Sequence, residues 1–354
     1  MAKAIRYTLL KGQWTTGIYD YQYFSSRLID SGEAQPWKTD ARYGKLSMSA
    51  SRMDYMKNLK TVAFLLSQDG QLVFETYFKD HEAHSISNSF SMAKSVVTLL
   101  LGCAIEDGYI EGLDQKVSDF FPQYRSGNGH ELTVGDLARM SSGMDWQESY
   151  YLPINVTTEA YYGDNISNLI TSRRIREKPG ESFEYLSGNT QLLAMVLDQA
   201  LPISLSEYLS NKLWQPMGME EAGQWMIDDV TGIERAYCCI NACGRDFLKL
   251  GQLLLQRGEW KGKQLIDAGF IDLMAKPYFE DSPQYGYGLW MDEKYKYPFY
   301  MMRGHLGQYV IVIPSHNVVI TRLGKRKSKI KVVERDMTED IYEYIDTAME
   351  MLGL

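Results

Sequence analysis

Hydrophobic and polar positions along the chain predict strands near both ends and helices between them. Residues 61–67 and 72–78 are rich in β-branched and aromatic side chains, which favour strands. Asp69-Gly70 between them is typical of a tight hairpin turn. Towards the C-terminus, a period of two returns in four runs that we interpret as successive strands, at residues 287–291, 300–303, 309–313 and 318–323.

Three stretches predict longer helices. Residues 91–108 are continuously apolar after a polar start and end at Gly108, which is typical of a buried helix. Residues 246–256 are amphipathic. The last segment places apolar side chains on one helical face, at Met337, Ile341, Ile345, Ala348 and Leu352. Between residues 111 and 229, short helical runs alternate with loops, and two of the runs begin like capping boxes, Thr133 to Asp136 and Ser204 to Glu207.

The order of these elements predicts an α+β fold, in which an antiparallel sheet flanked by helices is interrupted by a mainly helical insertion. We expect residues 1–110 and 230–354 to form an α/β sandwich lobe, with residues 1–55 as an irregular arm over it. Residues 111–229 are expected to form a helical lobe. The active site is expected at the seam between the two lobes, because ligand sites favour such clefts.

The composition of the chain excludes several classes of protein. The 354 residues are 45% hydrophobic and 23% charged, as in ordinary globular proteins, and the net charge of −8 argues against nucleic acid as a partner. Four cysteines are too few for a disulfide framework. No apolar run approaches the roughly 18 residues of a membrane span. No secretory signal is visible, so the sequence as it stands predicts a cytoplasmic protein, or an exported one if it has been truncated.

The start of the predicted buried helix carries the strongest candidate chemistry. Ser91 and Lys94 are three residues apart and therefore share one helical face. A serine hydroxyl becomes a good nucleophile when a neighbouring base takes its proton, and a partly desolvated lysine can be that base. By itself this spacing is more often an ordinary helix start, but a lysine within an apolar helix usually has a functional partner.

Two further motifs are weaker when each is taken alone. Tyr185-Leu186-Ser187 precedes a helical run, and a tyrosine beside a lysine can accept or relay protons, although a structural tyrosine is the commoner case. Residues 303–308, which contain His305, Gly307 and Gln308, lead into a strand. A free amide at this strand edge could complete an oxyanion hole, although a glycine-rich turn is the simpler interpretation.

In the order Ser-x-x-Lys, Tyr-x-Ser and His-x-Gly, the three motifs resemble the serine β-lactamase and penicillin-recognising superfamily. The similarity is to the branch with class C β-lactamases, D-alanyl-D-alanine carboxypeptidases, family VIII esterases and 6-aminohexanoate-dimer hydrolase. It extends from about residue 60 to residue 322 and is supported by residues 90–102, 137–146, 178–197, 213–219, 244–258, 285–290 and 304–324. The resemblance implies a β-lactamase/transpeptidase-like fold.

The resemblance also implies roles for single residues. Ser91 would be the acylated nucleophile, Lys94 its proton acceptor and Tyr185 the group that passes protons to the leaving group. The backbone amides of Ser91 and Gln308 would form the oxyanion hole. His305-Leu306-Gly307 occupies the place of the Lys-Thr-Gly motif of β-lactamases, which makes His305 and Gly307 candidate substrate-binding residues.

Two departures from the family pattern bear on the substrate. Ser187 stands where penicillin-recognising enzymes have an asparagine, and His305 replaces their fixed cation. Both changes favour ester or amide substrates over β-lactams. Residues 140–150 look closest to the dimer-hydrolase branch, in which a loop tyrosine closes over an amide, and Tyr150 is the best positional match, followed by Tyr151. Trp146, Tyr150 and other aromatic side chains of the insertion would roof the site and favour an apolar or flat acyl group.

Other clusters favour ordinary structural roles. His81 and His84 are three residues apart, which does not fit the His-Glu-x-x-His zinc motif. Cys238, Cys239 and Cys243 lack a fourth nearby ligand, so packing is favoured over zinc. The basic run of residues 325–331 is interpreted as a solvated loop rather than a binding patch.

The sequence therefore predicts a serine hydrolase that cleaves a small ester, amide or peptide-like substrate through an acyl-enzyme, with no cofactor and no metal. One alternative is a β-lactamase or penicillin-binding D,D-peptidase. A second alternative is a non-catalytic scaffold on the same fold. The substrate and the oligomeric state remain open at this point.

Overall fold

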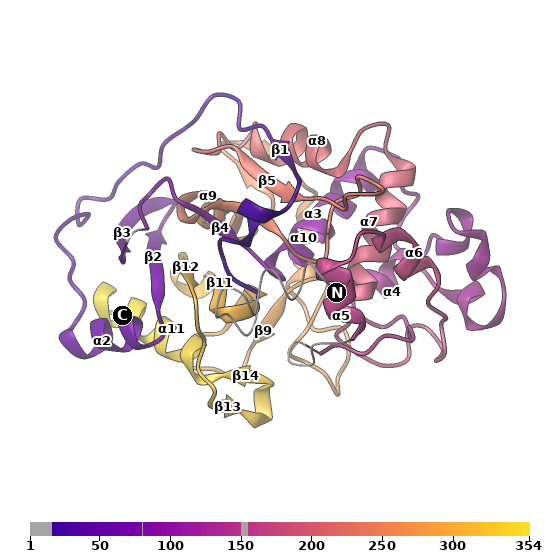
Figure 1. The fold of residues 1–354 in the computed structure, drawn as a ribbon. Helices are drawn as coiled ribbons and strands as arrows, with labels where there is room; N and C mark the ends of the chain where they lie inside the picture. The colour runs from indigo at the N-terminus through magenta and orange to yellow at the C-terminus, as the bar shows by residue number, and fades with distance from the viewer. Residues whose placement is uncertain (1–15, 80, 150–154) are drawn as a thin grey trace.

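The computed structural model describes residues 16–79, 81–149 and 155–354 (Figure 1). Its largest sheet has six antiparallel strands in the order β3-β2-β12-β11-β10-β9. Their bounds are β2 Thr61–Gln68, β3 Gln71–Tyr77, β9 Trp290–Asp292, β10 Phe299–Gly304, β11 Gln308–Ile313 and β12 Val318–Gly324. The hairpin and the four C-terminal strands predicted from the sequence are thus confirmed, although the first of the four is shorter than its apolar run.

Both faces of this sheet are covered by helices, which is why its central strands are apolar at nearly every position. Alternate residues of β12 belong to different cores, with Val319 on the side of helix α9 (Gly244–Leu255) and Ile320 on the side of helix α11 (Glu339–Leu352). Helix α2 (Ala50–Asn58) lies beside α11 and is tied to it by Arg52 (Figure 1). The α+β class with an antiparallel sheet flanked by helices is therefore confirmed.

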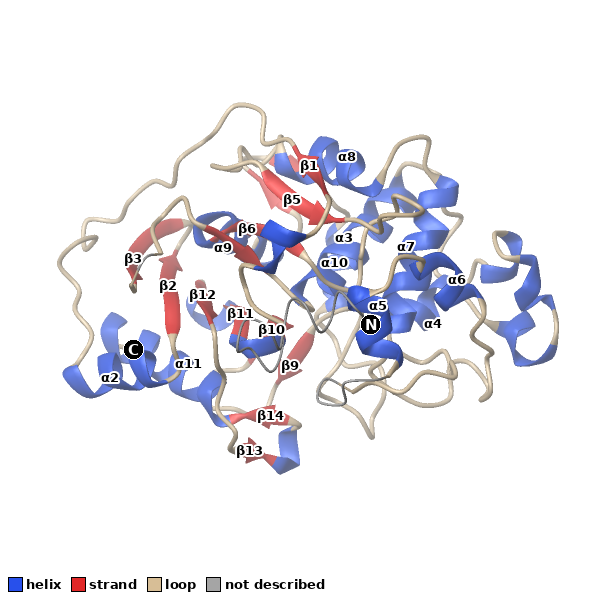
Figure 2. Cartoon of the chain, viewed as in Figure 1, coloured by secondary structure: helices blue, strands red, loops and turns tan. Residues whose placement is uncertain are grey.

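The remaining helices gather beside the sheet, on the right in Figure 2. They are α3 Met92–Glu106, α4 Val134–Ala138, α5 Val156–Tyr162, α6 Ile166–Thr171, α7 Ser187–Ala200, α8 Leu205–Leu209 and α10 Ala268–Met274. Short 3-10 or π turns connect several elements, namely η2 Asp20–Tyr23, η3 Val117–Asp119, η4 Pro122–Arg125, η5 Gly127–Glu131, η6 Ser210–Trp214, η7 His305–Gly307, η8 Pro314–His316 and η9 Val333–Arg335. Helix α3 is almost entirely buried and ends before Gly108, as predicted.

Of the two predicted capping boxes, one is complete. The Thr133 side chain accepts a hydrogen bond from the Asp136 amide, and the Asp136 carboxylate accepts one from the Thr133 amide. At the other, the Ser204 hydroxyl accepts from the Glu207 amide, which is one half of the box. Both helices nevertheless begin at the predicted residue.

A second sheet of four antiparallel strands, in the order β1-β5-β6-β4, was not predicted. Its strands are β1 Ser26–Ile29, β4 Ile86–Asn88, β5 Gly223–Met226 and β6 Ile240–Cys243. The N-terminal arm is therefore not wholly irregular, because β1 pairs with β5 and α2 is helical. Strands of three or four residues leave almost no periodic pattern, which explains the omission. Two minor pairs, β7 Glu259–Trp260 with β8 Lys263–Gln264 and β13 Lys331–Val332 with β14 Met337–Thr338, complete the sheets. The division into lobes at residues 111–229 stays a prediction.

Candidate active site

Ser91 and Lys94 lie together at the N-terminus of α3. Ser91 is the N-cap, and the Lys94 side chain is only 2% exposed. The Lys94 Nζ atom is 3.0 Å from Ser91 Oγ and donates a second hydrogen bond to the Tyr237 carbonyl oxygen at 2.8 Å. Burial lowers the pKa of Lys94 to about 8, although the nearby Glu148 carboxylate opposes the shift. A lysine with this pKa can accept a proton near neutral pH.

The backbone immediately before Ser91 is strained. Phe90 has a φ of 44°, which is unusual for an aromatic residue and costs roughly 1–3 kcal/mol. Its amide donates to Asn88 Oδ1 at 2.8 Å, and this bond fixes the sharp turn between β4 and α3. Strained residues of this kind cluster at active sites, and nothing in the sequence marked Phe90 as one.

Tyr185 packs directly against this pair from the N-terminal side of α7. The Lys94 Nζ atom is 5.2 Å from the centroid of the Tyr185 ring. The same ring contacts Trp290, with centroids 5.1 Å apart, and Tyr285. Burial raises the pKa of Tyr185, and a hydrogen bond with Ser91 lowers it by less. Tyr185 is therefore a neutral phenol at physiological pH and is suited to donating or relaying a proton.

The segment that contains His305 lies against the Ser91 site on a third side. A side chain on Gly304 would collide with the Ser89 carbonyl oxygen, so the end of β10 touches the chain just before Ser91. The His305 ring meets the Phe90 ring edge-on, with centroids 5.5 Å apart. Burial and the charge of Lys327 lower the pKa of His305 to about 4, so the imidazole is neutral at pH 7 and does not supply the fixed cation of a β-lactamase.

Gln308 is held rigidly where the oxyanion hole is predicted. Its side chain donates to the His305 and Gly324 carbonyl oxygens at 3.0 and 2.6 Å and accepts from the Gly324 amide. The turn before it is fixed by the buried Arg322 guanidinium, which donates to the Leu306 and Gly307 carbonyl oxygens. The polar atoms of the Gln308 side chain are thus engaged by the backbone around the turn.

Glu148 is the residue at this site that sequence reasoning missed. Its carboxylate accepts hydrogen bonds from Trp146 Nε1 at 2.8 Å, from the Ser187 amide at 2.8 Å and from Ser187 Oγ at 2.7 Å. Trp146 and Ser187, both predicted to bind substrate, therefore direct their polar atoms to Glu148. Glu148 lies within residues 140–150, the segment similar to the dimer-hydrolase branch, but nothing in that segment singled it out.

Tyr150 and Tyr151, the predicted loop tyrosines, lie outside the described residues. Tyr161 and Tyr162, which belong to the same aromatic-rich region, pack on Phe24 of the N-terminal arm. These two rings support the arm.

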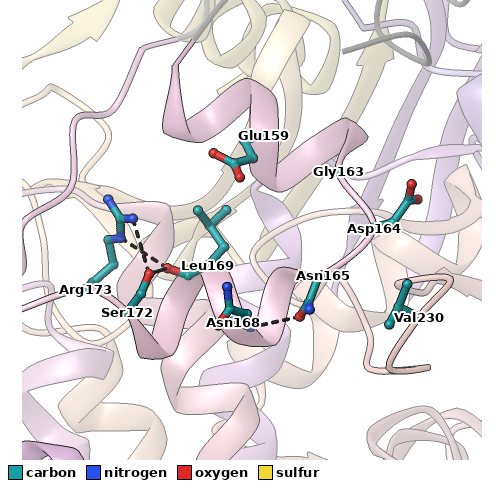
Figure 3. A pocket seen from close by; sticks show the side chains of 9 residues that line it. All are labelled: Glu159, Gly163, Asp164, Asn165, Asn168, Leu169, Ser172, Arg173 and Val230. Carbon is teal, nitrogen blue, oxygen red and sulfur yellow. Dashed lines mark hydrogen bonds between the residues drawn. The ribbon is translucent and has the colours of Figure 1, made fainter.

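A separate pocket of about 310 Å³ lies at the surface between α5 and α6 (Figure 3). It is lined by Glu159, Gly163, Asp164, Asn165, Asn168, Leu169, Ser172, Arg173 and Val230. None of these residues belongs to the Ser91 site.

The histidines and cysteines considered for metal binding have other partners. His81 is buried against Tyr19, whereas His84 is exposed and faces Glu221. Cys238 and Cys239 form a disulfide, and Cys243 donates to Asp246. Within the described ranges, no group of three or more His, Cys, Asp or Glu side chains could hold a metal ion.

Among the described helices, no single one is long and apolar enough to cross a membrane. The bent pair Ser187–Ala200 and Leu205–Trp214 would be long and apolar enough only if counted together.

The chain is similar to known proteins of one family. Residues 50–341 match the family model described as Beta-lactamase. By sequence, the chain is 24% identical over 226 residues to the 6-aminohexanoate-dimer hydrolase of Paenarthrobacter ureafaciens, a match that covers 60% of this chain and only 56% of that protein.

Solved structures agree with the sequence matches. A Bacillus anthracis protein assigned as a 6-aminohexanoate-dimer hydrolase superposes with a TM-score of 0.83 at 21% identity, covering 98% of this chain and 95% of that chain. A family VIII carboxylesterase superposes with a TM-score of 0.63 at 13% identity, covering 86% and 99%. At these identities the likeness shows the fold.

Proposed function

The chain belongs to the beta-lactamase family, and from this premise we propose that it cleaves an ester or amide bond through an acyl-enzyme formed on Ser91. The observation that carries the proposal is the contact between Ser91 Oγ and the buried Lys94 Nζ at 3.0 Å. A desolvated amine within hydrogen-bond reach of a serine hydroxyl is the arrangement that activates such a nucleophile.

In the proposed reaction, Lys94 takes the proton of Ser91 Oγ as the oxygen attacks the substrate carbonyl. The amides of Ser91 and Gln308 stabilise the negative charge that develops on the carbonyl oxygen. The Tyr185 phenol then delivers a proton to the departing alcohol or amine and recovers one from Lys94. In the second half, water attacks the acyl group, the proton path runs in reverse, and Ser91 is released. Every proton in this cycle is held by Ser91, Lys94, Tyr185 or water.

Two residues at the site, Ser187 and His305, are the reason for proposing esters and amides rather than β-lactams as substrates. Ser187 is bound to Glu148 and offers no side-chain amide to grip an acylamide, and the neutral His305 offers no charge at that position. The names of the two relatives, a dimer hydrolase and a carboxylesterase, are consistent with this choice.

A screen of p-nitrophenyl esters, short amides and D-amino-acid peptides tests the proposal, with Ser91→Ala as control. We expect turnover by the wild type and a fall of more than about 10³-fold in Ser91→Ala. Turnover of the chromogenic cephalosporin nitrocefin, or a stable penicillin adduct, would instead favour the β-lactamase or D,D-peptidase alternative. A folded wild type without any turnover or adduct would favour the scaffold.

A further inference from the structure

The disulfide in the segment before β6 joins two neighbouring residues, Cys238 and Cys239, and both are buried. A disulfide stabilises a protein mainly by closing a loop in the unfolded chain, and the gain grows with the length of that loop. A link between neighbours closes no loop beyond the peptide bond that already joins them. Its effect is therefore expected on the local backbone rather than on the stability of the whole chain.

The backbone at this link has an unusual conformation. Cys239 has a φ of 79°, in the left-handed region that side chains other than glycine, asparagine and aspartate rarely adopt. The disulfide and the peptide bond between the two cysteines close one small ring, which restricts rotation of the backbone within it. Reduction opens the ring and leaves Cys239 free to relax from this conformation.

The segment around the disulfide is bound to the start of α3. Four consecutive carbonyl oxygens, those of residues 237–240, each accept a hydrogen bond. In chain order, their donors are Lys94 Nζ at 2.8 Å, Trp225 Nε1 at 3.0 Å, the Met226 amide at 3.1 Å and the Ser89 amide at 2.7 Å. Two of these donors, Ser89 and Lys94, lie on either side of Ser91 in the chain. The segment with the disulfide therefore holds the backbone before the candidate nucleophile and the side chain of its candidate base.

Tyr237, the residue directly before the disulfide, contacts Lys94 in two ways. Its carbonyl oxygen accepts from Lys94 Nζ, and the centroid of its ring is 5.4 Å from the same atom. The other hydrogen bond of Lys94 Nζ is to Ser91 Oγ. A displacement of Tyr237 would therefore redirect the amine relative to Ser91 and admit water to it. Burial is the main cause that lowers the pKa of Lys94, so hydration would raise it again.

On the premise of the proposed hydrolase function, we propose that the Cys238–Cys239 disulfide is a positioning element of the active site, and that acylation of Ser91 slows when this bond is reduced. In the reduction, a dithiol supplies two electrons and two protons, the bond between the sulfur atoms breaks, two thiols form, and the dithiol closes to its own disulfide. Glutathione disulfide reverses the step by two exchange reactions and leaves as two glutathione thiols. The cysteine pair is then a site at which the thiol redox state sets the rate of the enzyme.

Reduction and reoxidation of the wild type test the proposal. The protein is treated with dithiothreitol, which is removed anaerobically before the assay, and a second sample is then reoxidised with glutathione disulfide. Alkylation in denaturant followed by mass spectrometry reports the bond, because only Cys103 and Cys243 react while it is intact. We expect reduction to lower kcat for p-nitrophenyl acetate at pH 7 by at least about tenfold, with KM nearly unchanged, because the disulfide acts through Lys94 and not on the substrate. Reoxidation should restore kcat.

Variants provide the same comparison if the reductant does not reach the buried bond. Cys238→Ala and Cys239→Gly each remove it, and glycine tolerates the left-handed φ of residue 239. Both should have the low kcat of the reduced protein, a rising limb of the pH profile at higher pH, and no response to dithiothreitol. The matched control is Cys103→Ala, which removes a buried free thiol and should respond as the wild type does. Four reactive thiols in an untreated and fully active protein, or full activity in folded Cys238→Ala and Cys239→Gly, would overturn the proposal.

The ionisation of Lys94 separates this proposal from the hydrolase function. It is followed by NMR of protein labelled with ¹³C at lysine Cε, with the Lys94 signal assigned by its loss in Lys94→Gln. We expect the pKa to rise from about 8 towards 10.5 on reduction. A wild type without turnover would refute the hydrolase, whereas the same Lys94 pKa in both redox states would refute the positioning role of the disulfide.

Discussion

Lys94 is the residue whose surroundings decide the chemistry most directly. Its amine is buried among the rings of Tyr185 and Tyr237 and hydrogen-bonds to Ser91 and to the Tyr237 carbonyl oxygen. The sequence placed Ser91 and Lys94 on one helical face by their spacing alone. It could not show the depth of burial, because burial depends on side chains that come from elsewhere in the chain.

The pH dependence of the reaction follows from the pKa of Lys94, which is about 8. In the proposed mechanism the amine must be neutral to take the proton from Ser91, so we expect the protonated form, which dominates below pH 8, to be inactive. We expect kcat/KM for a neutral ester to rise about tenfold per pH unit up to about pH 8 and then to level. A profile measured from pH 5.5 to 10 checks this, and a limb near the ordinary lysine value of 10.5 would contradict it.

The Glu148 carboxylate should affect the pH at which kcat/KM rises. Its negative charge stabilises the protonated Lys94 amine and so raises the pKa of Lys94. Glu148→Gln removes the charge, and the rising limb of the profile should then shift to lower pH. Glu177→Gln, a change at an exposed glutamate, is the matched control and should leave the limb in place. An unmoved limb in Glu148→Gln, or a shift to higher pH, would show that Glu148 acts on packing alone.

At the level of elements, long periodic segments were predictable and short ones were not. The six-stranded sheet, α3, α9 and α11 are regular enough to be recognised from periodicity. The second sheet was missed, because its strands have three or four residues and pair with strands far away in the sequence, as β1 (Ser26–Ile29) does with β5 (Gly223–Met226). The same limit hid Glu148, which contacts Ser187 from a loop.

The turn between β10 and β11 offers a test at this scale. Gly307 has a φ of 85°, and an added Cβ would collide with the Arg322 guanidinium that holds the turn. We expect Gly307→Ala to displace the Gln308 amide and to lower kcat by about 10²–10³-fold.

The matched control is Gly262→Ala. Gly262 has a φ of 83° with nothing within 4 Å of the added Cβ, so the change should cost about 1 kcal/mol of stability without affecting turnover. Equal turnover in the two variants would mean that the Gly307 turn plays no part in catalysis.

For the molecule as a whole, the site exists only because distant segments meet. Ser91 follows β4, Tyr185 precedes α7 and Gln308 begins β11. The family resemblance predicted this meeting, and the structure brings Ser91, Lys94 and Tyr185 into contact and seats His305 against Phe90. The catalytic roles of these residues remain proposals.

Arg235 is a buried link between the helical part and the second sheet. It donates to the carbonyl oxygens of Ala160 and Gly163 at the end of α5 and lies 3.8 Å from Asp228. We expect Arg235→Met to lower the free energy of unfolding by about 3–5 kcal/mol, because Asp228 and two carbonyl groups lose a buried partner. Urea denaturation measures the change. Arg176→Met, which breaks an exposed ion pair with Asp145, should cost less than about 1 kcal/mol, and equal losses would contradict the interpretation.

The acyl-enzyme itself is tested most directly by mass spectrometry after reaction with a fluorophosphonate. The wild type should gain one adduct, which peptide mapping places on Ser91, and Lys94→Ala should label at least about 10²-fold more slowly while remaining folded. Ser91→Ala should gain none. A folded wild type that stays unlabelled, or a Ser91→Ala protein that labels equally well, would contradict a serine nucleophile at this site.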